Sequence, residues 1–198
     1  HWWKATIYMD IDEYEKAADS YRTALSMARK DNKDNVQNIS FDYAQALFML
    51  KKYDEADAIY RQMLREDETD QAAMVGIARN MFERENYSEM FPLLKKCQKL
   101  DADYSEVYRF FAYAYDKLGE TDKAIDNGFT WFEKDEDADL EFLTKIALKH
   151  KSYAVAKARE KVKKSENPAQ WRVLLISIYG ESCEYELAVK EYDALEAE

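Results

Sequence analysis

The chain has 198 residues, of which 47% are apolar, and only 4 are glycine and 2 are proline. This composition suits one compact domain or one repeat array, and it argues against a β-sandwich and against long linkers. The net charge of −11 argues against nucleic-acid binding, because lysine and arginine contacts with phosphate supply most of that affinity. No apolar run reaches 18 residues, so we expect no membrane-spanning segment.

Six pairs of amphipathic helices are predicted along the chain. The first helices of the pairs are expected at about 1–11, 38–51, 72–84, 105–118, 138–150 and 169–181. The second helices are expected at about 14–29, 54–66, 88–100, 121–134, 152–164 and 184–197. The polar segment 29–38, between the first two pairs, is predicted to be a mobile loop.

The pairs repeat with a period near 34 residues. An anchor at the start of each second helix recurs, at intervals of 39, 34, 34, 32 and 32 residues, as Tyr14, Tyr53, Tyr87, Thr121, Tyr153 and Tyr185. Three residues after the anchor, a column of mostly small residues holds Ala17, Ala56, Met90, Ala124, Ala156 and Ala188. Seven residues after it, a column rich in tyrosine holds Tyr21, Tyr60, Leu94, Gly128, Glu160 and Tyr192. This self-similarity predicts a helical solenoid in which aromatic side chains fill the space that small ones leave.

The period, the small residues near the middle of both helices and the aromatics around them resemble the tetratricopeptide repeat family. Gly119 stands at the family's usual turn glycine, and Pro168 stands at its usual repeat-ending proline. The resemblance covers nearly the whole chain. It implies an all-α fold, a right-handed superhelical solenoid of antiparallel helix pairs with about six repeats. Within a single array over 1–198, we expect units at about 1–35, truncated at its start, 36–70, 71–104, 105–137, 138–168 and 169–198.

Two places depart from the repeat pattern. Gly128 stands where an aromatic is expected and Trp131 where a small residue is expected, either as a volume swap in which Trp131 fills the room at Gly128 or as two unrelated changes. In the fifth unit, Glu160 and Lys163 interrupt the apolar columns, so that unit is expected to be the weakest part of the stack or to have an exposed face.

Three aspartates at alternate positions, Asp135, Asp137 and Asp139, are arranged as in a calcium-binding loop. However, Leu140 occupies the place that requires glycine, and Ile146 occupies the place that requires a bidentate glutamate. We therefore interpret this segment as an acidic turn between repeats, and we expect no metal site.

No motif in the sequence indicates catalysis. A Ser/His/Asp or Cys/His arrangement, a glycine-rich phosphate loop and an HExxH motif are all absent. The two histidines are the terminal His1 and His150, which lies between two helices. Cys97 falls in a column of small apolar residues, so we interpret it as a core residue and not as a nucleophile. We expect neither enzymatic activity nor a cofactor.

The resemblance implies that the first helices line a concave groove that commonly binds peptides. The groove rows lie twelve, eight and five residues before each anchor, a spacing that places the three residues of a unit on one helix face. From these rows we select ten candidate groove residues: Phe41, Gln45, Phe48, Val75, Arg79, Phe82, Arg109, Tyr113, Asp116 and Lys145.

Two features of these rows suggest binding chemistry. The phenylalanines at 41, 48 and 82 are expected to form an apolar patch. Arg79 and Arg109, on adjacent first helices, are a candidate anion site unless Asp116, Glu83 or Glu141 neutralises them.

The function implied by the resemblance is a non-catalytic scaffold for protein–protein interaction, which binds a peptide or partner segment in the groove. Two alternatives remain open: an assembly or secretion helper of an envelope complex, and the sensing or docking part of a larger regulatory protein. No three successive units supply the lysines, asparagines and arginine of the chaperone-binding subtype, which argues against recognition of acidic chaperone tails.

The two ends of the array carry apolar residues where a solenoid needs polar caps. They are Trp2 and Trp3 at one end, and Tyr192 and Leu195 at the other. We expect either end-to-end self-association or additional native sequence. The missing initiator methionine is consistent with a piece of a longer protein, and the compartment is left open.

Overall fold

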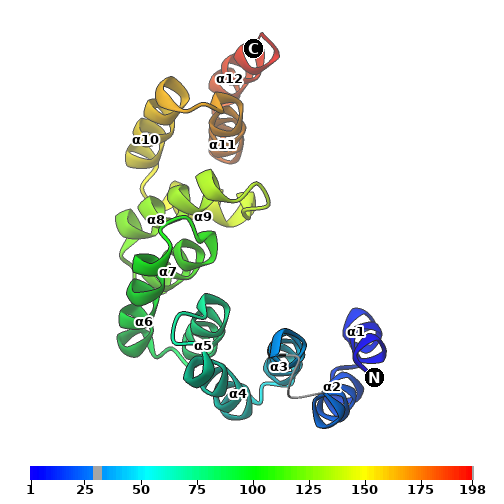
Figure 1. The fold of residues 1–198 in the computed structure, drawn as a ribbon. Coiled ribbons are helices and arrows are strands. Elements are labelled where there is room, and N and C mark those ends of the chain that lie inside the picture. Colours follow the sequence, from blue (N-terminus) through cyan, green and yellow to red (C-terminus); the bar gives the residue numbers. More distant parts are fainter. Residues whose placement is uncertain (29–32, 198) are drawn as a thin grey trace. The chain divides into compact units, whose positions relative to one another are not determined.

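The computed structural model describes residues 1–28 and 33–197, and within them the chain is entirely helical apart from its turns (Figure 1). The helices are α1 (Trp2–Asp10), α2 (Tyr14–Met27), α3 (Lys33–Met49), α4 (Tyr53–Glu66), α5 (Gln71–Glu83), α6 (Tyr87–Leu100), α7 (Ser105–Lys117), α8 (Thr121–Lys134), α9 (Leu140–Lys149), α10 (Lys151–Lys164), α11 (Pro168–Glu181) and α12 (Tyr185–Glu196). The prediction of an all-α fold built from helix pairs is confirmed. None of the described helices combines the length and apolarity that a bilayer span requires.

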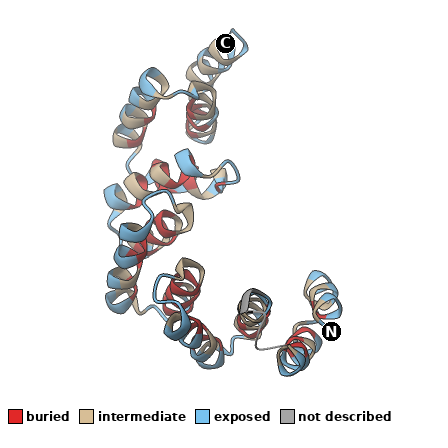
Figure 2. Ribbon diagram, in the orientation of Figure 1, coloured by how far each residue is buried: buried red, intermediate tan, exposed pale blue. Residues whose placement is uncertain are grey.

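Contacts along the chain define two compact units, His1–Ala102 and Asp103–Glu198. The first contains α1 to α6 and the second contains α7 to α12. In each unit the buried residues lie where neighbouring helices face each other (Figure 2). Ala17, Ala56 and Met90, three residues after their anchors, are all fully buried. The small side chains of Ala17 and Ala56 allow the helices to approach closely at these contacts.

Five of the turns within helix pairs share one backbone geometry. In each, the second residue before the anchor has a positive φ angle, and these residues are Asp12, Lys51, Glu85, Gly119 and Cys183. The next backbone N–H donates to a carbonyl five residues earlier, as from Glu13 to Tyr8 at 2.9 Å. This pairing caps the end of the first helix. Only one of the five positions is glycine, although the left-handed conformation strains any other residue.

Introducing a glycine in one of these turns and removing the glycine from another are expected to change the free energy of unfolding in opposite directions. Lys51→Gly should raise the free energy of unfolding by about 1 kcal/mol, because the exposed Lys51 has a φ of 58°. Gly119→Ala should lower it by about 1 kcal/mol, because Gly119 has a φ of 73° with no other atom close enough for an added Cβ to contact. Urea unfolding of the two variants checks both signs. Shifts in the same direction would contradict the turn geometry.

The fifth pair differs from the other five, and the predicted alignment of its second helix is wrong. α10 begins at Lys151, two residues before the predicted anchor Tyr153. His150 alone connects α9 to α10, and its φ is −141°. This turn is therefore two residues shorter than the turns of the other five pairs, and it contains no residue in the left-handed conformation. The first helix of this pair keeps its predicted alignment, whereas the second is shifted by two positions.

The shift changes which residues of α10 pack. Ala154 and Ala158 occupy the corrected columns and are fully buried, whereas Ala156, predicted to pack, is exposed. Glu160 and Lys163 also lie on the exposed side of the helix. They do not interrupt the apolar columns, so the reason for expecting a weak fifth unit is removed, and the alternative of an exposed face agrees with the structure.

The structure describes only part of the predicted loop at 29–38. Residues 33–38 belong to α3, so this part of the loop prediction is wrong. Residues 29–32 lie outside the described part of the chain. The longer first interval is absorbed by a longer helix, since α3 has 17 residues and α5 has 13.

The interpretation of Gly128 and Trp131 as a volume swap is also wrong. A Cβ on Gly128 would lie 2.9 Å from side-chain carbons of both Leu143 and Ile146, so these residues fill the space at the glycine. Gly128 thus allows α9 to pack closely against α8. Trp131 packs elsewhere, with its ring centroid 5.8 Å from that of Tyr113.

Two of the three aspartates after α8 make local structural contacts. Asp135 accepts hydrogen bonds from the Trp131 indole N–H at 2.9 Å and from the Asp137 backbone N–H at 3.0 Å. Asp139 caps α9 by accepting from the Phe142 backbone N–H at 3.0 Å. These contacts agree with the interpretation as an acidic turn. Over the residues that the structure describes, no group of three or more potential ligand side chains is placed to hold a metal ion.

Candidate functional site

The three predicted groove phenylalanines of the first unit are half-buried. Each packs its ring against a tyrosine of the second helix in its own pair. The ring centroids are 5.8 Å apart for Phe41 and Tyr60, 5.5 Å for Phe48 and Tyr53, and 5.9 Å for Phe82 and Tyr87.

Arg79 on α5 contacts both of the preceding helices. Its guanidinium carbon lies 3.9 Å from the centroid of Phe48 on α3, and its Nη2 donates to the Tyr60 hydroxyl of α4 at 3.2 Å. Burial raises the pKa of Tyr60 to about 12, although the nearby Arg79 lowers it, so the phenol is neutral at pH 7. Among the described residues no carboxylate pairs with Arg79, and its buried Nε has no hydrogen-bond partner. Arg79 therefore presents an uncompensated positive charge on an aromatic support.

The other two candidates of this unit are less distinctive. Gln45 is half-buried, while Val75 is buried in the packing of α5. Val75 therefore contributes to the interior more than to an open face.

The first unit also contains a buried polar cluster that the sequence reasoning missed. The Asn80 amide donates to one carboxylate oxygen of Asp57 at 2.5 Å, and Arg84 donates to the other at 3.3 Å. Asn80 is fully buried and Asp57 nearly so. The sequence contains a signal for this cluster, because Asn80 and Asp57 both stand at repeat positions that the other pairs fill with apolar residues. The cluster joins α4 to α5.

In the second unit, Arg109 forms an ion pair with Glu106, one turn earlier on α7. Its guanidinium carbon also lies 5.0 Å from the centroid of Phe110. The neutralising carboxylate is therefore Glu106, and not one of the three that the sequence suggested. Arg109 thus differs from Arg79, since its charge is already compensated within its own helix.

Tyr113 and Asp116 are the other candidates on α7. The Tyr113 ring meets the edge of Phe142 with centroids 4.4 Å apart, and burial raises the pKa of its phenol. Asp116 forms an ion pair with Lys149 of α9. Both side chains therefore help to join α7 to α9, and both remain half-exposed.

A groove of about 900 Å³ lies between the first helices α9 and α11. It is lined by Leu140, Glu141, Thr144, Lys145, Leu148, Lys149, Ser177 and Glu181. Glu141, Lys145 and Leu148 are the three groove-row residues of the fifth unit, so the predicted face and the hollow coincide on α9. A hydrogen bond of 2.8 Å between the hydroxyls of Thr144 and Ser177 joins the two helices.

Lys145 is the candidate groove residue within this hollow. Its side chain is exposed, and no ion pair with a described carboxylate involves it. The groove thus combines apolar side chains with the ammonium group of Lys145 and the carboxylates of Glu141 and Glu181.

The remaining sequence-based interpretation concerns Cys97. It is fully buried, and burial raises the pKa of its thiol to about 11. A thiol with this pKa is almost entirely protonated at pH 7, whereas the thiolate is the nucleophile. The interpretation of Cys97 as a core residue is confirmed.

Comparison with known proteins places this geometry in a family context. A sequence model described as tetratricopeptide repeat matches residues 1–31. The comparison with curated proteins gives no match.

Solved structures share the fold along most of the chain. A thermophilic tetratricopeptide repeat protein from Thermus thermophilus has a TM-score of 0.61 at 14% identity, covering 88% of this chain and 95% of its own. A tetratricopeptide repeat protein from Parabacteroides merdae has a TM-score of 0.60 at 19% identity, covering 98% of this chain and 75% of its own. YrrB, described as a tetratricopeptide repeat protein with an unusual peptide-binding site, has a TM-score of 0.51 at 16% identity, covering 96% of this chain and 88% of its own.

These similarities establish a helical solenoid of repeats, a fold that generally serves as a non-catalytic scaffold for protein interaction. The recognition of tetratricopeptide repeats from the sequence is confirmed, because residues 1–31 match the family and the chain as a whole has the fold of tetratricopeptide repeat proteins.

Proposed function

We propose that this protein binds segments of partner proteins on the faces of its first helices. The observation that carries the proposal is the groove between α9 and α11, whose lining includes the groove-row residues Glu141, Lys145, Leu148 and Ser177. It offers Leu140 and Leu148 for apolar contact and Lys145 for a carboxylate. A peptide site generally combines apolar pockets with a few polar groups that fix orientation. The peptide-binding site named for YrrB supports this use of the fold.

In the first unit, we propose that Arg79 binds a carboxylate of a partner segment. The guanidinium is held between Phe48 and Tyr60, so little side-chain freedom is lost on binding. It also lacks a carboxylate partner among the described residues. Arg109 is a weaker candidate, because Glu106 already pairs with it. The predicted anion site therefore becomes a site centred on Arg79.

A random-peptide display selection on the chain, followed by affinity measurements on the selected peptides, tests this proposal. Lys145→Glu and Arg79→Gln are expected to weaken binding of the peptides that use each face by about tenfold or more, because hydrogen bonds with charged groups contribute about 1.5–3 kcal/mol. Arg79→Gln should also flatten the salt dependence of its peptides.

Matched controls separate the first-helix faces from general charge effects. Lys163→Glu on α10 and Arg61→Gln on α4 make the same substitutions at exposed positions of second helices, so binding should be unchanged. Equal losses in the control and test variants would contradict the proposal, as would full affinity in both test variants. Circular dichroism of each variant establishes that the fold is retained.

A further inference from the structure

The helices α9 and α11, which form the groove, run parallel and in register. The hydroxyls of Thr144 and Ser177 join the two helices at 2.8 Å. Near the C-terminal ends of these helices, Lys151 of α10 forms an ion pair with Glu184, which lies between α11 and α12. Both pairs join residues 33 positions apart in the sequence, so a residue of α9 lies level with the residue of α11 that follows it by 33. This register orders the lining of the groove along its length.

Two leucines mark the ends of the groove on α9. Leu140, Thr144 and Leu148 are spaced four apart, so they form one row along the helix. Both leucines are half-buried, and between them the Thr144 hydroxyl is already bonded to Ser177. A helix rises 1.5 Å per residue, so the two leucines stand about 12 Å apart along its axis. The row therefore offers a ligand two apolar contacts with this separation.

Three charged side chains of the groove form no ion pair with another described residue. Glu141 and Lys145 are exposed and stand four apart, in the order that favours an ion pair within a helix, yet they form none. Glu181, at the C-terminal end of α11, is likewise exposed and unpaired. Lys149 differs from Lys145, because it forms an ion pair with Asp116. The charges that remain for a ligand are thus negative at each end of the groove and positive between the ends.

We propose, on the basis of the peptide binding proposed above, that this groove selects an extended segment with an acidic residue between two large apolar residues at alternate positions, flanked by basic residues. Side chains of an extended chain alternate between two faces, and the chain rises about 3.3 Å per residue. Its first, third and fifth side chains therefore share one face, and the first and fifth lie about 13 Å apart. This separation matches that of Leu140 and Leu148, and it places the third side chain beside Lys145.

The width of the groove and its terminal charges complete the match. The hydrogen bond between Thr144 and Ser177 holds α9 close to α11, so the floor of the groove is narrow. A helix with its side chains is about 10 Å wide, whereas an extended chain occupies about 5 Å, the spacing of strands in a sheet. The carboxylates of Glu141 and Glu181 face the basic residues that flank the apolar pair. The motif is symmetric, so both backbone directions satisfy it.

Fluorescence anisotropy with three synthetic peptides of the same composition tests the spacing. Each peptide contains two leucines, one glutamate and two flanking lysines in a background of alanine and serine. In the first peptide the leucines stand two positions from the glutamate, in the second they adjoin it, and in the third they stand four positions from it, as on one face of a helix. The first peptide is expected to bind about tenfold or more tightly than the other two, because a misplaced leucine loses its apolar contact.

A charge swap tests the polar contact. Lys145→Glu should weaken binding of the first peptide by about tenfold or more, because two carboxylates then face each other. Replacing the glutamate of the peptide by lysine should weaken binding to the wild-type chain and restore binding to Lys145→Glu. Lys163→Glu on α10 makes the same substitution at an exposed position outside the groove, so it should leave all affinities unchanged.

The outcomes separate this inference from the peptide binding on which it rests. If display-selected peptides bind the groove but the first peptide has no advantage, or if the helix-spaced peptide binds best, the inference is wrong and the proposed function stands. If the charge-swapped peptide does not regain affinity for Lys145→Glu, the acidic residue does not lie at Lys145, and the inference is again wrong. If neither designed nor selected peptides bind the chain, both are wrong.

Discussion

Replacing Gly76 by alanine is expected to lower the free energy of unfolding by about 1–3 kcal/mol, because it overpacks the α4–α5 interface. An added Cβ would lie 2.4 Å from the Cζ atom of Tyr60, well inside contact distance. Tyr60 cannot withdraw easily, since its ring is fully buried and its hydroxyl accepts a hydrogen bond from Arg79. Alanine normally stabilises a helix by about 1 kcal/mol relative to glycine, so the expected sign is opposite to the propensity rule.

Urea unfolding measures this effect, and Gly180→Ala on α11 is the matched control. No atom from outside the helix backbone is close enough to meet a Cβ at Gly180, so its substitution should raise the free energy of unfolding by about 0.5–1 kcal/mol. Tyr60→Leu removes the ring that the added Cβ would meet. Gly76→Ala should therefore lower the free energy of unfolding less in a Tyr60→Leu background than in the wild type. A stabilising Gly76→Ala would show that the Tyr60 ring does not rest on this glycine.

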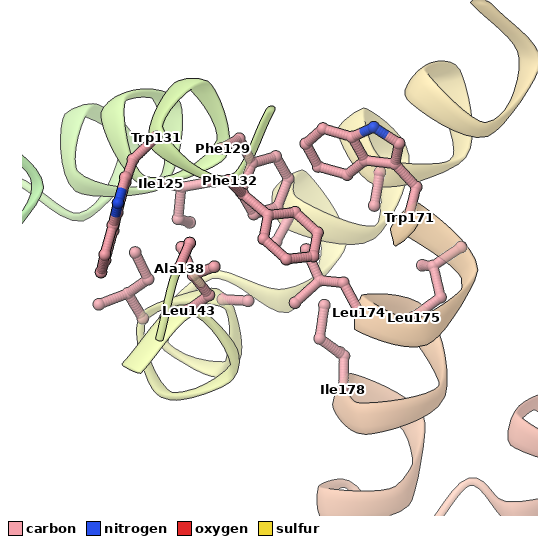
Figure 3. Packing of buried hydrophobic residues seen from close by; sticks show 14 of the residues in the cluster. Ile125, Phe129, Trp131, Phe132, Ala138, Leu143, Trp171, Leu174, Leu175 and Ile178 are labelled. Atoms are coloured by element: carbon pink, nitrogen blue, oxygen red, sulfur yellow. The ribbon is translucent and has the colours of Figure 1, made fainter. Parts of the chain in front are cut away.

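The substitution Trp171→Ala in the second unit is expected to lower the free energy of unfolding by about 3–5 kcal/mol, the largest effect predicted for this protein. Trp171 is fully buried on α11, and its ring meets Phe129 and Phe132 of α8 edge to face (Figure 3). The centroid separations are 5.2 Å and 5.3 Å. Removing the indole leaves a cavity where these helices meet and also removes the aromatic pairing, which contributes about 0.5–1.5 kcal/mol for each pair.

Hydrogen exchange locates this loss along the chain. Amides of α8, α9 and α11 should exchange faster in Trp171→Ala, while those of α2 to α5 should keep their protection, since each repeat contacts only its neighbours. Trp171→Phe is the matched variant. It retains an aromatic ring and removes an indole N–H that is buried without a hydrogen-bond partner, so its loss should be smaller. Equal losses in both variants would contradict this account of the core.

The repeat period predicted the helix pairs, because packing columns recur at one spacing throughout. The alignment on Tyr153 is wrong for the fifth pair, because the shortened turn at His150 moves the second helix by two residues. Residue identity in one column could not reveal a change in turn length. The burial of Ala154 and Ala158 in the structure reveals the shift. The sequence alone does not, because it also has an alanine at position 156, which fits the unshifted alignment equally well.

Contacts between pairs were harder to predict than positions within them. The fit of Tyr60 against Gly76 depends on the distance between two helices, which no local pattern encodes. The ion pair of Arg109 with Glu106 was accessible, because residues three apart on a helix are neighbours. The groove rows contain three of the residues of α9 that line the hollow, but the depth of that hollow follows from how α11 packs beside it.

Peptide binding on the first helices is the central claim, and hydrogen exchange with and without a display-selected peptide tests it most directly. We expect the bound peptide to slow exchange on first helices, with α9 and α11 protected by peptides that lose affinity in Lys145→Glu. Peptides that depend on Arg79 should protect α3 and α5. Protection confined to the second helices, or no protection at saturating peptide, would contradict the claim.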